Sequence, residues 1–119
     1  MGKLTTHVLD TSQGSPGAGI TLTLERIHGD RREVVATTVT NADGRCDSPV
    51  LEGAAFAAGE YELRFEVGAY LSAAGVPAPA TGPRFLDIVV LRFGIADASE
   101  HYHVPLLLSP FGYSTYRGS

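Results

Sequence analysis

The 119-residue sequence contains no tryptophan and only one cysteine, Cys46. A single cysteine excludes a disulfide within the chain and leaves no CxxC pair for zinc or redox chemistry. The absence of tryptophan and of a second cysteine argues against an immunoglobulin-type interaction module, which normally packs a buried tryptophan against paired cysteines. The low cysteine content also fits a reducing compartment.

Strong charge of one sign and long apolar runs are missing as well. Nine lysines and arginines stand against 13 acidic residues, a formal net charge of −4. We therefore expect neither a nucleic acid nor a membrane surface as a partner. No apolar stretch has the length of a signal-peptide core or a membrane span, so we expect a cytoplasmic protein. The chain length predicts a single domain, residues 1–119.

Short segments with alternating apolar and polar residues make up most of the chain, and Gly, Pro, Asn and Asp separate them. Such alternation is typical of half-buried strands. Strands are predicted at residues 5–10, 20–27, 33–40, 61–67, 84–93, 101–108 and 111–117, with a short one near 49–51. The one credible helix is 68–75, because VPAPATGP follows it. Seven to eight strands with one short helix predict an all-β, two-sheet antiparallel sandwich.

The strand at residues 101–108 has two unlike faces, because successive side chains point to opposite sides. One face is an ordinary core face, made of Tyr102, Val104, Leu106 and Leu108. The other carries His103 beside Pro105 and Leu107, which is more apolar than a solvated face should be. The first strand repeats this pattern with His7 and Leu9 outward. We infer that another copy of the chain covers this outer face.

If these two strands are neighbours, His7 and His103 emerge on the same side of the sheet. On the last strand, placing Tyr113 in the core puts Ser114 and Tyr116 on the histidine side. The turn NADGR at 41–45 contains Gly44, which can supply a positive φ, and Arg45 could reach the rim of that face. Each of these residues also has a purely structural interpretation, as a hydrogen-bonded histidine or a turn residue.

A zinc site is one alternative for the histidines. His101 and His103 share a strand face at a spacing that zinc sites use, with His7 as a conceivable third ligand. No carboxylate or thiol stands nearby in the sequence to complete the set, so we expect no metal. A serine nucleophile at Ser114 is not supported either, because no strand-to-helix elbow motif surrounds it.

Three segments carry a family resemblance. They are LTTHVLDTSQGSPG from residue 4, TNADGRCDSP from residue 40 and HYHVPLLLSPFGYSTYRGS from residue 101 to the end. These segments resemble the transthyretin-like family and, within it, the branch of 5-hydroxyisourate hydrolases. The similarity runs from Leu4 to Ser119, and the terminal tetrapeptide at 116–119 is its most specific part.

The resemblance implies a two-sheet sandwich assembled as a homotetramer, a dimer of dimers whose central channel holds the active sites. The implied reaction opens the six-membered lactam ring of 5-hydroxyisourate to 2-oxo-4-hydroxy-4-carboxy-5-ureidoimidazoline in urate breakdown, with no cofactor. Carried over by position, the catalytic residues are His7, Arg45 and His103. Together with Ser114 from the strand alternation, the expected substrate-binding residues are His7, Arg45, Ser114, Tyr116, Arg117, Gly118 and Ser119.

Hydrolysis of a lactam needs an activated water, a donor to the developing oxyanion and a proton for the leaving nitrogen. Neutral imidazoles suit the first and third tasks, and we expect His7 and His103 to share them in an order that the sequence leaves open. Arg45 offers fixed donors and favours the neutral form of nearby imidazoles. Tyr116 and Ser119 would close the pocket, while Arg117 would hold the tail by pairing within the interface between subunits.

Three other functions stay open at this point. The main one is a non-enzymatic carrier of small aromatic ligands, because transthyretin itself has the same implied fold and channel. A carrier has no need of two channel histidines, an arginine turn and a fixed polar terminus together. A generic interaction module and a metal-dependent hydrolase are weaker alternatives.

Overall fold

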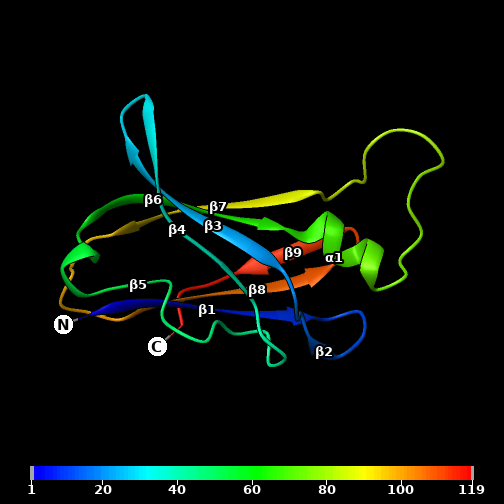
Figure 1. The fold of residues 1–119 in the computed structure, drawn as a ribbon, viewed down its shortest axis with the longest axis horizontal. Helices are drawn as coiled ribbons and strands as arrows, with labels where there is room; N and C mark the ends of the chain where they lie inside the picture. Colours follow the sequence, from blue (N-terminus) through cyan, green and yellow to red (C-terminus); the bar gives the residue numbers. More distant parts are fainter. Residues whose placement is uncertain (1, 119) are drawn as a thin grey trace.

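Two sheets pack face to face in the computed structural model, which describes residues 2–118 (Figure 1). The first sheet has the order β2-β1-β8-β9, with β5 also paired to β1; the second has the order β4-β3-β6-β7. The strands of the first sheet are β1 (Lys3–Asp10), β2 (Ser15–Pro16), β5 (Leu51–Glu52), β8 (Tyr102–Ser109) and β9 (Gly112–Thr115). Those of the second are β3 (Thr21–His28), β4 (Arg31–Val39), β6 (Gly59–Glu66) and β7 (Ile88–Ile95).

The predicted all-β, two-sheet sandwich is thus confirmed, with one pairing that differs from the antiparallel expectation. Strands β1 and β8 run parallel, whereas the other strand pairs among residues 2–118 are antiparallel. A parallel pair needs a long connection, and here almost the whole chain lies between the two strands. This pairing joins the two histidine-bearing strands directly.

Alternation along the strands builds the core between the sheets. On β1 and β8 the inward side chains are fully or almost fully buried, and they join the inward side chains of β3, β6 and β7 in one cluster. Each fully buried leucine contributes about 1.5 to 3 kcal/mol relative to an exposed one. The fully buried members include Leu4, Val8, Leu22, Leu24, Leu63, Phe65, Leu106 and Leu108.

Several element boundaries differ from the sequence prediction by a few residues, and the helix and β7 are two of them. The helix α1 spans Val67–Ala73, slightly earlier than predicted. Strand β7 begins at Ile88 instead of residue 84. Arg84 explains the second difference, because its guanidinium donates to the carbonyls of Val76 (2.6 Å) and Pro77 (3.3 Å) and holds this segment in the loop. The loop extends beyond the end of the sandwich in Figure 1.

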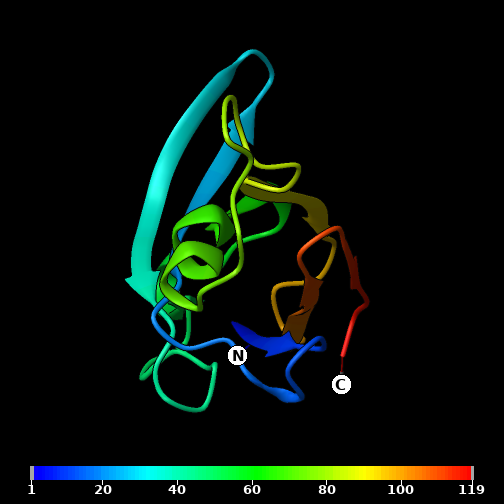
Figure 2. The ribbon, with the colours of Figure 1, turned by 90° about the vertical axis from the view of Figure 1, so that its right-hand side faces the viewer.

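Seen along the strands, the long β3–β4 hairpin and the C-terminal segment lie at opposite sides of the molecule (Figure 2). A 3₁₀ turn, η1 (Gly53–Ala55), follows β5. No helix among residues 2–118 is long and apolar enough to cross a membrane.

Candidate active site

The parallel pairing of β1 and β8 puts three polar side chains on one outer face. Thr5 lies opposite His103, and His7 lies opposite Pro105. Because residues on the inner face of β1, such as Thr6, are buried, Thr5, His7 and His103 all point outward. The structure therefore brings His7 and His103 together on adjacent strands, diagonally placed in the ladder.

His103 is held from two sides. Thr5 Oγ1 lies 2.8 Å from His103 Nδ1, which is hydrogen-bonding distance. The backbone N–H of Gly118 donates to the His103 carbonyl at 2.7 Å. The backbone of Gly118 also lies so close to the ring that a Cβ added there would be 2.6 Å from His103 Cδ2. The strand ladder, a hydroxyl and the C-terminal segment together fix this imidazole.

The surroundings of His103 favour its neutral form. Burial lowers the pKa of His103 below its ordinary value, and the charges of Arg45 and His7 lower it further. A neutral imidazole keeps a lone pair that can take a proton from water. His103 is therefore in the protonation state that a general base requires at neutral pH.

His7 is oriented by a backbone carbonyl. Its Nε2 lies 2.9 Å from the carbonyl oxygen of Asp43. Since a carbonyl only accepts hydrogen bonds, His7 Nε2 must carry the hydrogen, and the neutral ring then has its lone pair on Nδ1. In the neutral ring, Nδ1 is therefore the nitrogen of His7 that can accept a proton.

A tight turn places Arg45 beside His7. The Asn41 side chain accepts hydrogen bonds from the backbone N–H groups of Asp43 (2.9 Å) and Arg45 (3.1 Å). Gly44 has a φ of 76°, as the turn prediction required. The Gly44 carbonyl accepts from the Val8 N–H at 2.8 Å, and Arg45 forms an isolated bridge with His7. The turn is thereby fastened to β1 next to the histidines.

A cavity of about 220 Å³ adjoins Arg45, with Lys3 and Thr5 also among its lining residues, and neither His7 nor His103 lines it. Sites for drug-sized ligands usually measure about 300 to 1,000 Å³, so this space suits a small molecule. Lys3 and Thr5 were missed as site residues from the sequence. The alternation of β1 could have revealed them, because it places both residues on the same side of the strand as His7.

Some residues of the C-terminal segment face the site and others do not. Ser114 lies opposite Leu107 in the β8–β9 ladder and so faces the histidine side. Arg117 turns the other way: its guanidinium lies 3.9 Å from the centre of the Tyr102 ring and donates to Glu100 (3.1 Å) and to the His101 carbonyl (2.9 Å). Arg117 therefore fastens the tail within its own chain. Ser119 lies outside the described residues.

Two tyrosines differ from the expectation. Tyr113 points inward but is 45% exposed, so its predicted place in the core is wrong. Tyr116 lines a cavity of about 360 Å³ at the open edge of the sandwich, with Tyr113 and Phe93, and the structure does not bring it to the histidines. The reason is that β9 is the last strand of its sheet and ends at Thr115. Beyond that point strand alternation no longer predicts the direction of a side chain.

The structure gives no support to the zinc alternative. Within residues 2–118, no group of three His, Cys, Asp or Glu side chains is placed to hold a metal ion. The site consists instead of two imidazoles, a guanidinium and a hydroxyl, which is a set suited to proton transfer and to binding an electron-rich small molecule.

Fold and site together define a β-sandwich of the transthyretin type with a histidine- and arginine-bearing outer face. The chain matches the HIUase/Transthyretin family over residues 4–118, and it belongs to that family.

The individual relatives include proteins named as enzymes and a transthyretin. A 5-hydroxyisourate hydrolase of Pseudomonas aeruginosa is 60% identical over 119 residues, covering 100% of this chain and 93% of the relative. Among solved structures, an (S)-allantoin synthase is 45% identical with a TM-score of 0.91; it covers 99% of this chain, which spans only 44% of that protein. Sea bream transthyretin in complex with thyroxine is 28% identical with a TM-score of 0.85, covering 98% of this chain and 94% of the other.

Proposed function

We propose that this protein is a 5-hydroxyisourate hydrolase. It opens the six-membered lactam ring of its substrate with water and gives 2-oxo-4-hydroxy-4-carboxy-5-ureidoimidazoline. One observation carries the proposal: a hydrolase relative is 60% identical over the full chain. The two imidazoles and the guanidinium on the outer face of β1 and β8 supply groups suited to this chemistry.

In the proposed mechanism, water attacks the lactam carbonyl and its proton passes to a neutral imidazole. The carbon–nitrogen bond then breaks, and the leaving nitrogen takes up a proton from an imidazolium. His7 and His103 share these proton transfers. Arg45 donates hydrogen bonds to the substrate's oxygens and stabilises the oxyanion as it forms.

The tail completes the proposed substrate site. Ser114 faces the histidine side, and Gly118 contacts His103 through its backbone. Arg117 supports the site by holding the tail against Glu100 and His101. The substrate contacts expected of Tyr116 and Ser119 stay predictions, as does the cytoplasmic location.

We further propose that the chain, as one domain, assembles into a homotetramer, a dimer of dimers with the sites in a central channel. Support comes from the outer face of the first sheet. Leu9 and Leu107 lie opposite each other there, each half-buried, on the same side as the histidines. An apolar patch around a small, open polar site is what a second subunit would cover.

The carrier alternative is the less favoured one. Transthyretin shares the fold, but the sea bream protein is only 28% identical, compared with 60% for the hydrolase relative. A carrier also has no use for a neutral, hydrogen-bonded imidazole beside a guanidinium.

The test uses 5-hydroxyisourate made in place by urate oxidase, with its ultraviolet absorbance followed in time. A hydrolase accelerates the decay in proportion to its concentration. A carrier would bind an aromatic ligand such as thyroxine and leave the decay rate at its spontaneous value.

A further inference from the structure

We propose that Thr5 is a positioning residue of this site, whose hydroxyl accepts a hydrogen bond from Nδ1–H of His103 and so leaves the lone pair on Nε2. The inference rests on the proposed function, because it assigns the nitrogen that takes the proton from water. The distance of 2.8 Å between Thr5 Oγ1 and His103 Nδ1 is its starting observation.

The strand ladder makes this contact rigid. Thr5 and His103 are direct partners in the parallel pairing of β1 and β8, which extends over seven residue pairs from Leu4 to Asp10. The next residue locks the same register, because the buried Thr6 hydroxyl donates to the Val104 carbonyl at 2.7 Å. Threonine is β-branched and restricted about χ1, so its hydroxyl has few alternative positions.

A hydroxyl can donate or accept, and the chemistry decides between the two. Once Nε2 has taken a proton, the imidazolium carries hydrogens on both nitrogens, and Nδ1 must then donate. If Nδ1–H already donates to Thr5 in the resting site, proton uptake needs no rearrangement of this bond. The opposite arrangement would place the hydrogen on Nε2 and leave the ring unable to act as a base there.

The hydroxyl also suits the charge of the site better than a carboxylate would. A carboxylate at this position would favour the imidazolium. The charged or titratable groups that act on His103 are Arg45 and His7, and both lower its pKa together with burial. An uncharged hydroxyl fixes the ring and leaves this effect in place.

His7 provides an internal contrast. Its Nε2–H donates to the Asp43 carbonyl, so neutral His7 has the opposite tautomer to the one proposed for His103. Nitrogen spectroscopy distinguishes the two forms, because a protonated and a lone-pair ring nitrogen resonate in different regions. One spectrum of the protein can therefore test both assignments.

The kinetic test compares Thr5→Val, which keeps the shape and removes the hydroxyl, with Thr5→Ser, which keeps the hydroxyl. Thr23→Val, on β3 in the other sheet, is the matched control. For Thr5→Val we expect kcat to fall by about 10- to 100-fold, with KM little changed, because a misplaced catalytic group costs up to about 10²-fold. Thr5→Ser should recover most of the loss, and Thr23→Val should have the parent rate.

The spectroscopic test uses ¹⁵N-histidine-labelled protein at a pH where His103 is neutral, with its signals identified by their loss in His103→Asn. The proposal expects hydrogen on Nδ1 in the parent protein and a mixture of tautomers in Thr5→Val. Hydrogen on Nε2 of His103 in the parent, or an unchanged kcat in a folded Thr5→Val, would overturn it. If Thr5→Val does not fold, Thr5→Ala takes its place.

These results separate the two proposals. A parent protein that leaves the decay of 5-hydroxyisourate unchanged refutes the proposed function, and the nitrogen spectrum alone then decides whether Thr5 fixes His103. An active parent with hydrogen on Nε2 keeps the hydrolase and removes the role of Thr5.

Discussion

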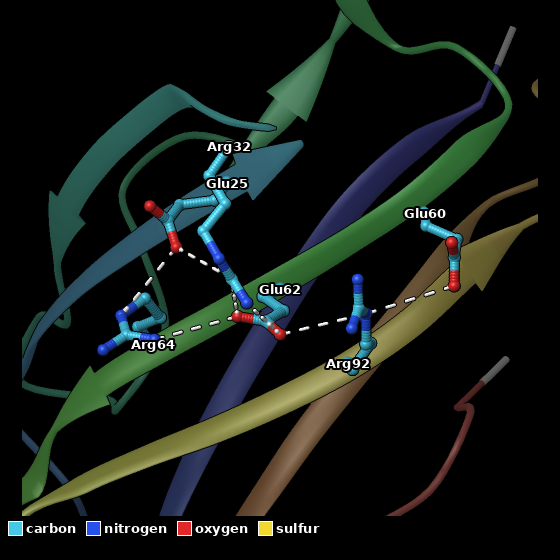
Figure 3. A network of polar contacts seen from close by, with 6 residues as sticks. All are labelled: Glu25, Arg32, Glu60, Glu62, Arg64 and Arg92. Carbon is cyan, nitrogen blue, oxygen red and sulfur yellow. Dashed lines mark hydrogen bonds and ion pairs between the residues drawn. The ribbon is translucent and has the colours of Figure 1, made fainter. Parts of the chain in front are cut away.

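The ionisable side chains on the outer faces of the two sheets differ in the partners that they contact. On the β4-β3-β6-β7 sheet, acidic and basic side chains alternate and pair with one another (Figure 3). Glu62 is at the centre, only 5% exposed although it points outward. Its carboxylate contacts Arg32, Arg64 (3.7 Å) and Arg92 (3.8 Å). Further ion pairs join this cluster to Glu25 and Glu60.

On the β2-β1-β8-β9 sheet, the two histidines have neutral partners. His7 bonds a carbonyl and His103 a hydroxyl, while Arg45 lies beside them on its turn. The first face satisfies its charges with groups of its own chain, as a solvated structural surface does. The second face holds each ring by one nitrogen and leaves the other available, which is how a site for a substrate is built.

The largest expected effect comes from removing His103, the proposed base on the second face. His103→Asn should reduce turnover of 5-hydroxyisourate by about 10² to 10⁴, the range for general acid–base catalysis, because asparagine cannot take the proton. Steady-state rates on freshly generated substrate measure the loss, and thermal unfolding should show a folded protein. Full activity in this variant would remove the assigned role.

The next effect tests the contact between the tail and the ring. Gly118→Ala places a methyl group where His103 Cδ2 is only 2.6 Å away, so the ring or the tail must move. We expect turnover to fall by about 10- to 100-fold with the core intact. Gly112→Ala, at the start of β9, serves as the control, because the added Cβ would meet only the Ser109 hydroxyl, at 3.6 Å. Equal rates for the two variants would contradict the tight packing.

Substitutions in the ion-pair cluster of the first face should change the stability of the protein and not its activity. A hydrogen bond from Arg32 lowers the pKa of Glu62, burial raises it, and the charges of Arg32, Arg92 and Arg64 lower it further, for a net lowering. Glu62→Gln should reduce the free energy of unfolding by about 1 to 2 kcal/mol, a modest value because the arginines are half exposed and screened.

Urea unfolding measures that change, and Glu60→Gln is the matched control. The side chain of Glu60 is 68% exposed and has one arginine contact at 4.0 Å, so its loss should change stability by less than about 0.5 kcal/mol. Because the pKa of Glu62 is lowered on folding, its contribution is present above the unfolded carboxyl pKa and is lost as pH falls through the folded one. A Glu62→Gln protein that is as stable as the parent at pH 7 would show that the Glu62 ion pairs do not stabilise the fold.

The smallest expected effect is in the pH profile. Since burial, Arg45 and His7 lower the pKa of His103, its neutral form persists to a more acidic pH than that of a free imidazole. The acid limb of kcat/KM should then lie below the ordinary imidazole pKa of about 6.5. An acid limb centred above that value would show that another group controls the rate.

Much of the fold was predictable from alternation alone. The buried and outward positions of β1 and β8 follow their sequence pattern, which is why His7 and His103 could be assigned to one face. The parallel direction of that pair was not predictable, because alternation does not report strand direction. The start of β7 was missed because Arg84 forms hydrogen bonds with loop carbonyls, which no local pattern reveals.

The sequence allowed us to predict which residues form the candidate site, but not which contacts they make. Alternation placed Thr5 on the histidine face, yet only the register of two distant segments shows that its hydroxyl reaches His103. Tyr116 illustrates the opposite limit, since the strand ends one residue before it. Similarly, the outward position of Glu62 gave no sign that three arginines would bury it.

The most direct test of the contrast between the faces follows the ultraviolet decay of 5-hydroxyisourate with equal amounts of parent protein, His103→Asn and Glu62→Gln. We predict rapid decay with the parent and with folded Glu62→Gln, and decay close to the spontaneous rate with His103→Asn. Equal decay with and without the parent protein, or equal loss in both variants, would contradict a hydrolytic site on the histidine face.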